Sequence, residues 1–157
     1  MKALHHANAP LEAEQLSARW ARLHRHVAFA FSASEAHYLR TAALALDDDL
    51  LALLLLKKLK IAAERQMSGL HGVVTMNSLV RFSFGGGSGL GRLVHPSCCE
   101  PGSLSIASQV GAGLAGMRTG QTILWPDADG ELRPLSVDTV ERVPAPKTRT
   151  LLSEQVR

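Results

Sequence analysis

The stretch Leu104–Trp125, LSIASQVGAGLAGMRTGQTILW, decides the fold of this chain. Its first four residues alternate apolar and polar side chains, as a half-buried strand does, and its last four are typical of a second strand. The apolar residues between them recur at i, i+4 and i+7 and form one helical stripe: Val110, Leu114 and Met117. Gly116 and Gly120 can then end the helix and turn the chain, because glycine accepts a positive φ. The stretch therefore predicts a strand, a short helix and another strand.

Further strands are predicted on both sides of this unit. Leu79–Phe84 alternates apolar and polar residues, Leu90–His95 follows a glycine-rich run, and Leu132–Val143 continues the apolar pattern. The run Gly85–Gly89 lacks the Gly-Lys-Ser/Thr ending and the following helix of a phosphate-binding loop, so we interpret it as a hairpin turn. Together these segments predict a small antiparallel sheet that carries one short helix.

The first 71 residues are predicted to be helical. The expected helices are Leu11–Phe31, Ser34–Leu46 and Leu50–Gln66. The acidic run between the second and third helices suits a helix start, because carboxylates accept hydrogen bonds from the free N–H groups there and lie at the positive end of the helix dipole. We therefore predict an α+β fold, in which a helical hairpin, with Leu11–Phe31 as an extra helix, precedes the sheet.

Leucines occupy every face of the first two turns of the third helix, Leu50–Leu59, so this helix must be buried on more than one side. Either Leu11–Phe31 folds back over it, or two copies of the chain meet there as a homodimer. The lysines that follow, Lys57, Lys58 and Lys60, are expected to restore a solvated face. The first helix also carries five basic side chains: Arg19, Arg22, Arg25, His24 and His26. They form either a patch for an acidic partner or an ordinary solvated face.

Composition and charge exclude several classes of function. Lys plus Arg is 17 against 14 for Asp plus Glu, which gives a net charge of +3 without a dense basic run and argues against sequence-specific DNA binding. No apolar run approaches the ~20 residues needed to span a bilayer, so we expect a soluble, cytoplasmic protein with no membrane partner. The adjacent Cys98 and Cys99 have no second pair to complete a zinc site and are expected to be reduced thiols. No metal ion and no cofactor is expected.

Four pieces of the chain carry a family resemblance through their order: Val73–Phe82 (VVTMNSLVRF), Leu93–Pro96 (LVHP), Ser105–Gly111 (SIASQVG) and Gly120–Ile123 (GQTI). Together they resemble the C-terminal domain of Gre-type transcript elongation factors, and the sequence VTMNS looks closest to the branch called regulator of nucleoside diphosphate kinase. The resemblance covers about Leu50 to Val143. It implies an FKBP-like domain over residues 72–144, preceded by the helical region 1–71, whose hairpin would be a short coiled-coil arm. The residues 145–157 follow Pro144 and are expected to form a flexible tail.

The resemblance also implies where the chain would act. Gre-type factors dock at the rim of the secondary channel of RNA polymerase, and the contact residues carried over to this chain are Ser108, Gln109, Val110 and Leu114. The family usually has Ser-Pro where this chain has Ser108 and Gln109, so the docking surface is altered. The i, i+4 spacing of Val110 and Leu114 also fits simple packing of the helix on its sheet. A helix over Leu50–Gln66 is about 26 Å long at ~1.5 Å per residue, shorter than the full-length arm of the family.

Three functions are compatible with these observations. The shortened arm favours a regulator that binds core RNA polymerase and competes with Gre-type factors, without catalysis of its own. The alternative is a transcript cleavage factor whose hairpin tip carries Asp47, Asp48 and Asp49 to the active site of the polymerase, where such carboxylates help to hold a catalytic metal and water. A peptidyl-prolyl isomerase is suggested by fold analogy alone, and the sheet offers few rings for such a site: Phe82, Phe84 and Trp125.

Overall fold

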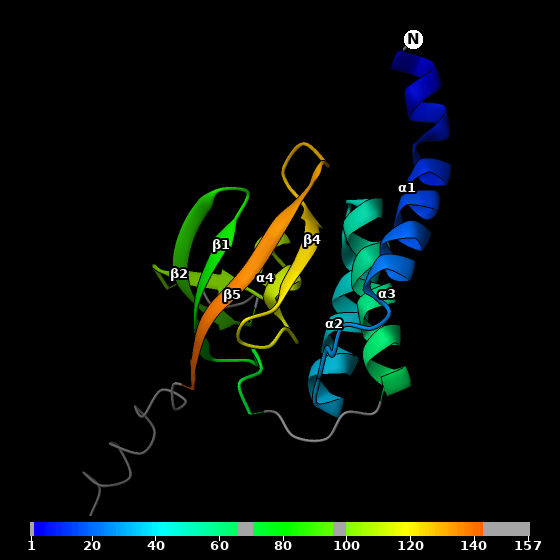
Figure 1. Ribbon diagram of the computed structural model, residues 1–157. Coiled ribbons are helices and arrows are strands. Elements are labelled where there is room, and N and C mark those ends of the chain that lie inside the picture. The colour runs from blue at the N-terminus through cyan, green and yellow to red at the C-terminus, as the bar shows by residue number, and fades with distance from the viewer. Residues whose placement is uncertain (1, 66–70, 96–99, 143–157) are drawn as a thin grey trace, which may run out of the picture.

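The computed structural model describes residues 2–65, 71–95 and 100–142 (Figure 1). The elements are α1 (Lys2–His24), α2 (Ala33–Ala45), α3 (Asp49–Arg65), β1 (Ser78–Phe84), β2 (Gly87–Val94), β3 (Ser103–Ser105), α4 (Gln109–Leu114), β4 (Thr122–Pro126) and β5 (Leu132–Arg142). The three long helices lie together beside the sheet, and α4 packs between the sheet and α3 (Figure 1). The predicted α+β class and the strand, helix and strand of the deciding stretch are confirmed. Cys98, Cys99 and the predicted tail 145–157 lie outside the described residues.

The sheet is mixed, which corrects the expected antiparallel arrangement. Its strand order is β3-β2-β1-β5-β4, and β3 pairs parallel to β2, with Leu104 opposite Leu93. The two strands run in the same direction, so β3 is not the second arm of a hairpin with β2. Gly91 makes room for this pairing, since a Cβ there would lie 2.8 Å from Cγ of Leu104.

The glycine-rich run forms the hairpin turn that was predicted. Gly85 and Gly86 have φ of 60° and 93°, and two consecutive positive φ angles match the right-handed twist of the strands they join. Strand β2 begins at Gly87, three residues before the expected start at Leu90. The run is therefore part of a β-hairpin, and its glycines serve backbone geometry.

The motif VTMNS shapes the entry to β1. The backbone N–H of Thr75 donates to Oγ of Ser78 at 2.9 Å, and Asn77 adopts a φ of 72°, a conformation that asparagine tolerates better than most residues. Just before this turn, Val74 exchanges backbone hydrogen bonds with the segment that follows α4, donating to Met117 O at 2.8 Å and accepting from Gly116 N at 2.9 Å. The motif thus joins the start of the sheet to the end of α4.

Helix α1 ends earlier than the apolar spacing predicted. It stops at His24 instead of Phe31, and Val27 and Phe29 form a turn beyond it. The reason is a tertiary contact, because the backbone N–H of Ala30 donates to Gly116 O at 3.0 Å and draws this segment onto the sheet domain. Phe29 is completely buried there, so the spacing of these apolar residues reflects burial of a connecting segment and not a longer helix.

Helix α2 starts through a capping box at Ser32, two residues before the expected start at Ser34. Oγ of Ser32 accepts from Glu35 N at 3.1 Å, and Glu35 Oε1 accepts from Ser32 N at 3.5 Å. Ser34, where the helix was predicted to start, lies inside the first turn instead. The second oxygen of Glu35 accepts from Met76 N at 2.6 Å, so the residue that caps the helix also fastens it to the entry of β1.

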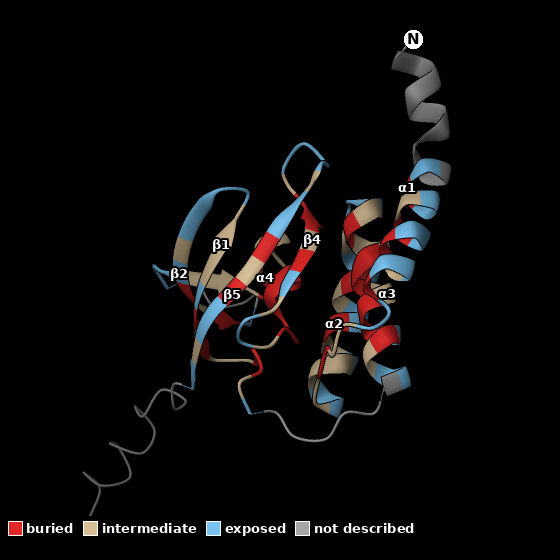
Figure 2. Cartoon of the chain, viewed as in Figure 1, coloured by how far each residue is buried: buried red, intermediate tan, exposed pale blue. Residues whose placement is uncertain are grey.

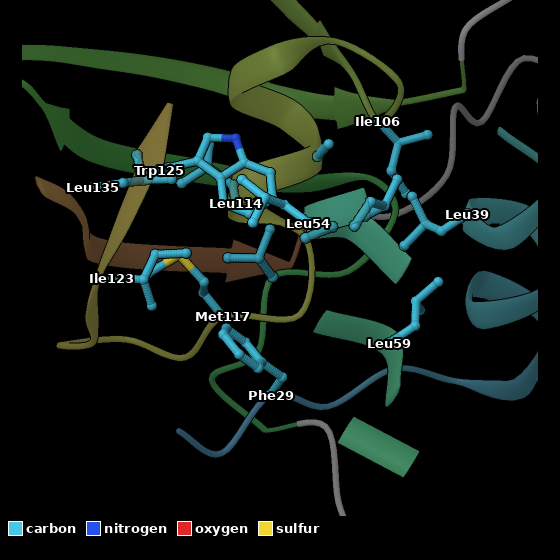
Figure 3. Close-up of a cluster of buried hydrophobic side chains, with 14 of the residues drawn as sticks. Phe29, Leu39, Leu54, Leu59, Ile106, Leu114, Met117, Ile123, Trp125 and Leu135 are labelled. Carbon is cyan, nitrogen blue, oxygen red and sulfur yellow. The ribbon is translucent and has the colours of Figure 1, made fainter. Parts of the chain in front are cut away.

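The helices and the sheet share one hydrophobic core. Figure 3 shows Phe29 and Leu54 from the helical part facing Leu114, Met117 and Trp125 from the sheet part. The division of the chain at residue 71 stays a prediction, but apolar packing continues across it. Among the described residues no helix is both long and apolar enough to cross a membrane.

The leucine run of α3 is buried within a single chain, because α1 and α2 both pack against it (Figure 2). Its buried members are Leu51, Leu54, Leu55 and Leu59. Of the two arrangements that the sequence allowed, the fold-back of the first helix is therefore present. Burial of these leucines does not require a homodimer, and the homodimer stays a prediction.

Trp20 and His24 attach α1 to the edge strand β4. Nε1 of Trp20 donates to Leu124 O at 2.6 Å, and Nε2 of His24 accepts from Leu124 N at 3.1 Å. Since Nε2 accepts, Nδ1 carries the proton and donates to Trp20 O at 2.7 Å, which defines a neutral imidazole. His24 is 5% exposed, so its expected place on a solvated basic face is wrong.

The burial of His24 predicts a loss of stability in acid. Desolvation lowers the pKa of His24 from its ordinary value of 6.5, so below about that pH the unfolded chain takes up the proton first. The free energy of unfolding should therefore be highest above pH 6.5 and fall as the pH drops from there toward the folded pKa. Urea unfolding followed between pH 8 and pH 5 measures this.

The matched variants are His24→Gln, which cannot titrate, and His26→Gln, which changes an exposed neighbour. We expect His24→Gln to flatten the decline and His26→Gln to keep it. Equal slopes in all three proteins would mean that His24 is not the group responsible.

Candidate functional site

The acidic turn caps helix α3. Asp47, Asp48 and Asp49 are all exposed, and Oδ1 of Asp48 accepts from Leu51 N at 3.1 Å while its carbonyl accepts from Ala52 N at 3.0 Å. Asp48 is therefore the N-cap, as the sequence predicted for this run. Within the described part of the chain, no three or more His, Cys, Asp or Glu side chains come close enough together to hold a metal ion.

Ser108 starts the short helix α4. Its Oγ accepts from Gly111 N at 3.1 Å and donates to Ser105 O at 2.6 Å, which ties the helix start to the end of β3. Gly111 permits this close approach, since a Cβ there would lie 1.9 Å from Ser105 O. Ser108 thus has a structural role in the junction where the resemblance places a docking contact.

Gln109 links the same junction to the turn between β4 and β5. Its Nε2 donates to Pro126 O at 2.6 Å and to Asp127 O at 2.5 Å, and its carbonyl accepts from Nε1 of Trp125 at 2.7 Å. The turn that it holds is reinforced by Arg133, which donates to Asp127 Oδ2 at 3.0 Å. The departure from the family's Ser-Pro therefore adds a side-chain amide that joins α4 to the neighbouring turn.

The other two sequence-derived contact residues face inward. Leu114 is completely buried, and Val110 is half-buried against the same core. Both pack α4 onto its surroundings, as their i, i+4 spacing suggested. Three of the four residues are partly exposed: Ser108, Gln109 and Val110. Leu114 is not available to a partner and instead packs α4 against the core.

Lys58 of α3 holds α4 in place, and its predicted position on a solvated face is wrong. It was expected on a solvated face but is completely buried, and its Nζ donates to Ala112 O at 3.0 Å and Gly113 O at 2.5 Å. These carbonyls belong to the C-terminal end of α4, where a cation is favoured by the helix dipole. A sequence signal existed, because Lys58 follows Leu54 by four residues and so lies on the buried stripe of α3.

Aromatic rings complete the environment of this ammonium group. Its Nζ lies 5.2 Å from the ring centroid of Phe29, 5.8 Å from that of Phe31 and 5.3 Å from that of Trp125, within cation–π range. Complete burial lowers the pKa of Lys58 well below its usual value, whereas the two carbonyls and the ring faces favour the charged form. The site therefore clamps α4 and offers no open cavity to a substrate.

The fold of this chain is similar to the solved structure of a Gre-type factor. The structure of the prokaryotic transcription elongation factor GreA/GreB from Nitrosomonas europaea is 26% identical to this chain with a TM-score of 0.50, and the match covers 72% of this chain and 97% of that one. The predicted resemblance to Gre-type factors is supported at the level of the fold.

Two other solved structures match with less similarity. GreA factor homolog 1 (Gfh1) of Thermus thermophilus is 19% identical with a TM-score of 0.38, covering 84% of this chain and 94% of that one. Gfh1 of Thermus aquaticus is also 19% identical with a TM-score of 0.38, covering 83% and 92%. No family model and no curated protein matches the chain. None of these comparisons points to the regulator of nucleoside diphosphate kinase branch.

The cap at Asp48 predicts a graded loss of stability. Asp48→Ala removes the acceptor for Leu51 N and should lower the free energy of unfolding by about 1 kcal/mol, whereas Asp48→Asn should cost only a few tenths. Asp47→Ala, one residue earlier, is the matched control and should change stability by less than about 0.5 kcal/mol. Chemical denaturation measures all three, and equal losses for Asp47→Ala and Asp48→Ala would contradict the capping role.

The clamp at Lys58 predicts a larger effect. Lys58→Met keeps most of the side-chain volume but leaves two buried carbonyls without a donor, so we expect a loss of about 1–3 kcal/mol. Lys58→Ala should cost more because it also leaves a cavity among the rings, and Lys60→Met is the exposed control. A Lys58→Met protein at least as stable as the wild type would contradict this. It would show that the free-energy cost of desolvating the ammonium group exceeds the stabilisation from its hydrogen bonds and ring contacts.

Proposed function

We propose that this chain is a transcription regulator that binds RNA polymerase in the manner of Gre-type factors. The observation that carries the proposal is the match to the Nitrosomonas europaea elongation factor, which extends over 97% of that chain at 26% identity. The proposed contact is the rim of the secondary channel of the polymerase. The same proposal places the protein in the cytoplasm, where it would meet the polymerase.

The proposed docking surface is the start of α4 together with the adjoining turn between β4 and β5. Ser108 and Gln109 stand at this junction, and Val110 adds half-buried apolar surface. The surface is supported from within by Leu114 and by the Lys58 clamp on the carbonyls of the helix. A rigidly held surface loses little conformational freedom on binding, which supports its use as an interface.

We further propose that the chain competes for the polymerase without catalysing RNA cleavage, as the shortened hairpin of the regulator of nucleoside diphosphate kinase branch suggests. The hairpin α2–α3 lies along the sheet part and is fastened to it through Glu35 and Lys58 (Figure 1). One acid of the turn, Asp48, is already occupied as a helix cap. These contacts favour a hairpin that supports the fold over one that projects carboxylates into an active site.

Transcript cleavage is the alternative, carried by the exposed carboxylates of Asp47 and Asp49. A peptidyl-prolyl isomerase has less support, because Trp125 is completely buried with its N–H engaged by Gln109 O and cannot line an open site. The proposed regulator has no catalytic residue and no cofactor of its own.

The decisive measurement is binding of the full chain to purified core RNA polymerase without DNA, followed by titration with a full-length Gre-type factor. We expect binding, and displacement as the competitor saturates the shared site. Binding that persists at saturating competitor would disprove the shared site. Backtracked complexes tested with the wild type and with Asp47→Asn/Asp49→Asn should show no stimulated cleavage by either protein; cleavage by the wild type that the variant lacks would establish the alternative.

Gln109→Pro tests the docking surface itself. Proline is tolerated at the first position of a helix, and Ser108 has φ of −74° and ψ of 164°, which suits a residue before proline. The fold should be kept, and affinity for the polymerase should rise several-fold because the variant recreates the family's Ser-Pro. Arg81→Ala, an exposed change on β1, is the control. Unchanged affinity in both variants would indicate that the start of α4 does not contact the polymerase.

A further inference from the structure

A basic groove runs between α1 and α3 on the side of the helices that the proposed polymerase contact does not use. It consists of two adjoining hollows of about 510 and 200 Å³, with Arg22 and Lys57 lining both. Five cationic side chains line the groove, two from α1, one from the turn that follows it and two from α3: Arg19, Arg22, Arg25, Lys57 and Lys60. The groove is therefore a concentration of positive charge on a chain whose net charge is only +3.

These cations are available to a partner. The three arginines and Lys60 are exposed, and Lys57 is half-buried. Within the described residues none of the five forms an ion pair. Arg19 and Arg22 lie one turn apart on α1, and Arg25 follows in the turn at the end of the helix, so the three form a row along this edge of the groove. Such a row matches carboxylates spaced along another helix.

The floor of the groove is small and apolar. Ala18 and Ala21 come from α1, and Ile61 comes from α3. Ala18 is exposed and Ala21 is half-buried, so another backbone can approach them closely, while Ile61 is 5% exposed and adds a small apolar contact. A groove of this form, apolar below and charged at its edges, suits an amphipathic helix.

Glu64 closes one end of the groove with the opposite charge. It lines the smaller hollow beside Arg25 and Lys60 and is exposed. A partner that is acidic along its whole length would be repelled there. The charges therefore define an order, carboxylates opposite the arginines and a neutral or basic residue opposite Glu64.

We propose that this groove binds an acidic amphipathic helix of a partner protein. The apolar side of that helix would lie on Ala18, Ala21 and Ile61, and its carboxylates would pair with the arginine row, whose planar forks match carboxylates in two-point hydrogen bonds. The site is separate from the α4 surface, so it does not depend on the proposed polymerase contact.

Nucleic acid fits the groove less well. Single strands bind where bases stack on aromatic side chains in a basic channel, and the groove is lined by alanine, isoleucine and charged or amide side chains with no ring among them. The groove chemistry thus favours carboxylates over phosphates.

The test uses a synthetic helical peptide of about 18 residues, labelled with fluorescein, with leucines at i, i+4 and i+7 and glutamates flanking them. Anisotropy titrations with the full-length protein compare it with a scrambled peptide of the same composition, a peptide with lysine in place of glutamate, and a 12-nucleotide single-stranded RNA. We expect saturable binding of the acidic helix, at least about tenfold tighter than any of the other three, that weakens as salt is raised.

Charge-matched variants locate the site. Arg22→Glu/Arg25→Glu should weaken binding by about tenfold or more, and Glu64→Gln should strengthen it a few-fold by removing the one repulsive charge. Arg40→Glu/Arg81→Glu makes the same charge change at exposed positions outside the groove and should leave affinity within about twofold. Circular dichroism and thermal unfolding establish that each variant is folded.

Three results would overturn the proposal. One is the absence of saturable binding of the acidic peptide at low salt when the protein is titrated to about 1 mM. Another is an equal loss of affinity in Arg22→Glu/Arg25→Glu and in the Arg40→Glu/Arg81→Glu control, which would indicate general charge attraction. The third is tighter, groove-dependent binding of the RNA, which would assign the surface to nucleic acid.

Discussion

The hydrogen bonds from Lys58 to the end of α4 are the interaction on which the arrangement of this molecule depends. The ammonium group reaches from the buried side of α3 to the carbonyls of Ala112 and Gly113, and three aromatic rings surround it. Burial of a cation is costly unless it is well paired, so the contact specifies one position of α3 relative to α4. The orientation of the proposed docking surface is thereby set by a residue of the helical part.

The same principle recurs at other contacts between the helices and the sheet part. The Glu35 carboxylate holds the entry to β1, and the Trp20 and His24 rings hold β4 through the peptide group of Leu124. Each contact pairs a side chain of a helix with a backbone group of the sheet part, and the apolar core lies between them. Polar groups at defined positions select one packing among many that apolar burial alone would permit. The arm of this chain is consequently an integral layer of the fold.

The sequence predicted local structure well and the relation between segments less well. Alternation located β1 and β5, and β-branched and aromatic residues located β4. The acidic run that contains Asp48 was found because helix starts have a strong chemical preference. The early end of α1 escaped prediction because Ala30 bonds to Gly116, a partner 86 residues away. The parallel pairing of β3 escaped prediction because the alternation of a strand does not say in which direction it pairs. Lys58 was misplaced because residue type was weighed above its position on the leucine stripe. The junction residues Ser108 and Gln109 were found through the family resemblance, whereas the carbonyls to which they donate could not be predicted from the sequence.

The link between α1 and β4 has a consequence for how the chain is made. Trp20 and its partner Leu124 are 104 residues apart, and a ribosome delivers them in that order at roughly 5–20 residues per second. For several seconds the amino-terminal helices exist while the strand that covers their indole and imidazole rings has not been synthesised. Closure of such a distant contact comes late, because the entropy of the intervening chain must first be overcome. The nascent helices therefore pass through an interval in which this apolar surface is open to chaperones.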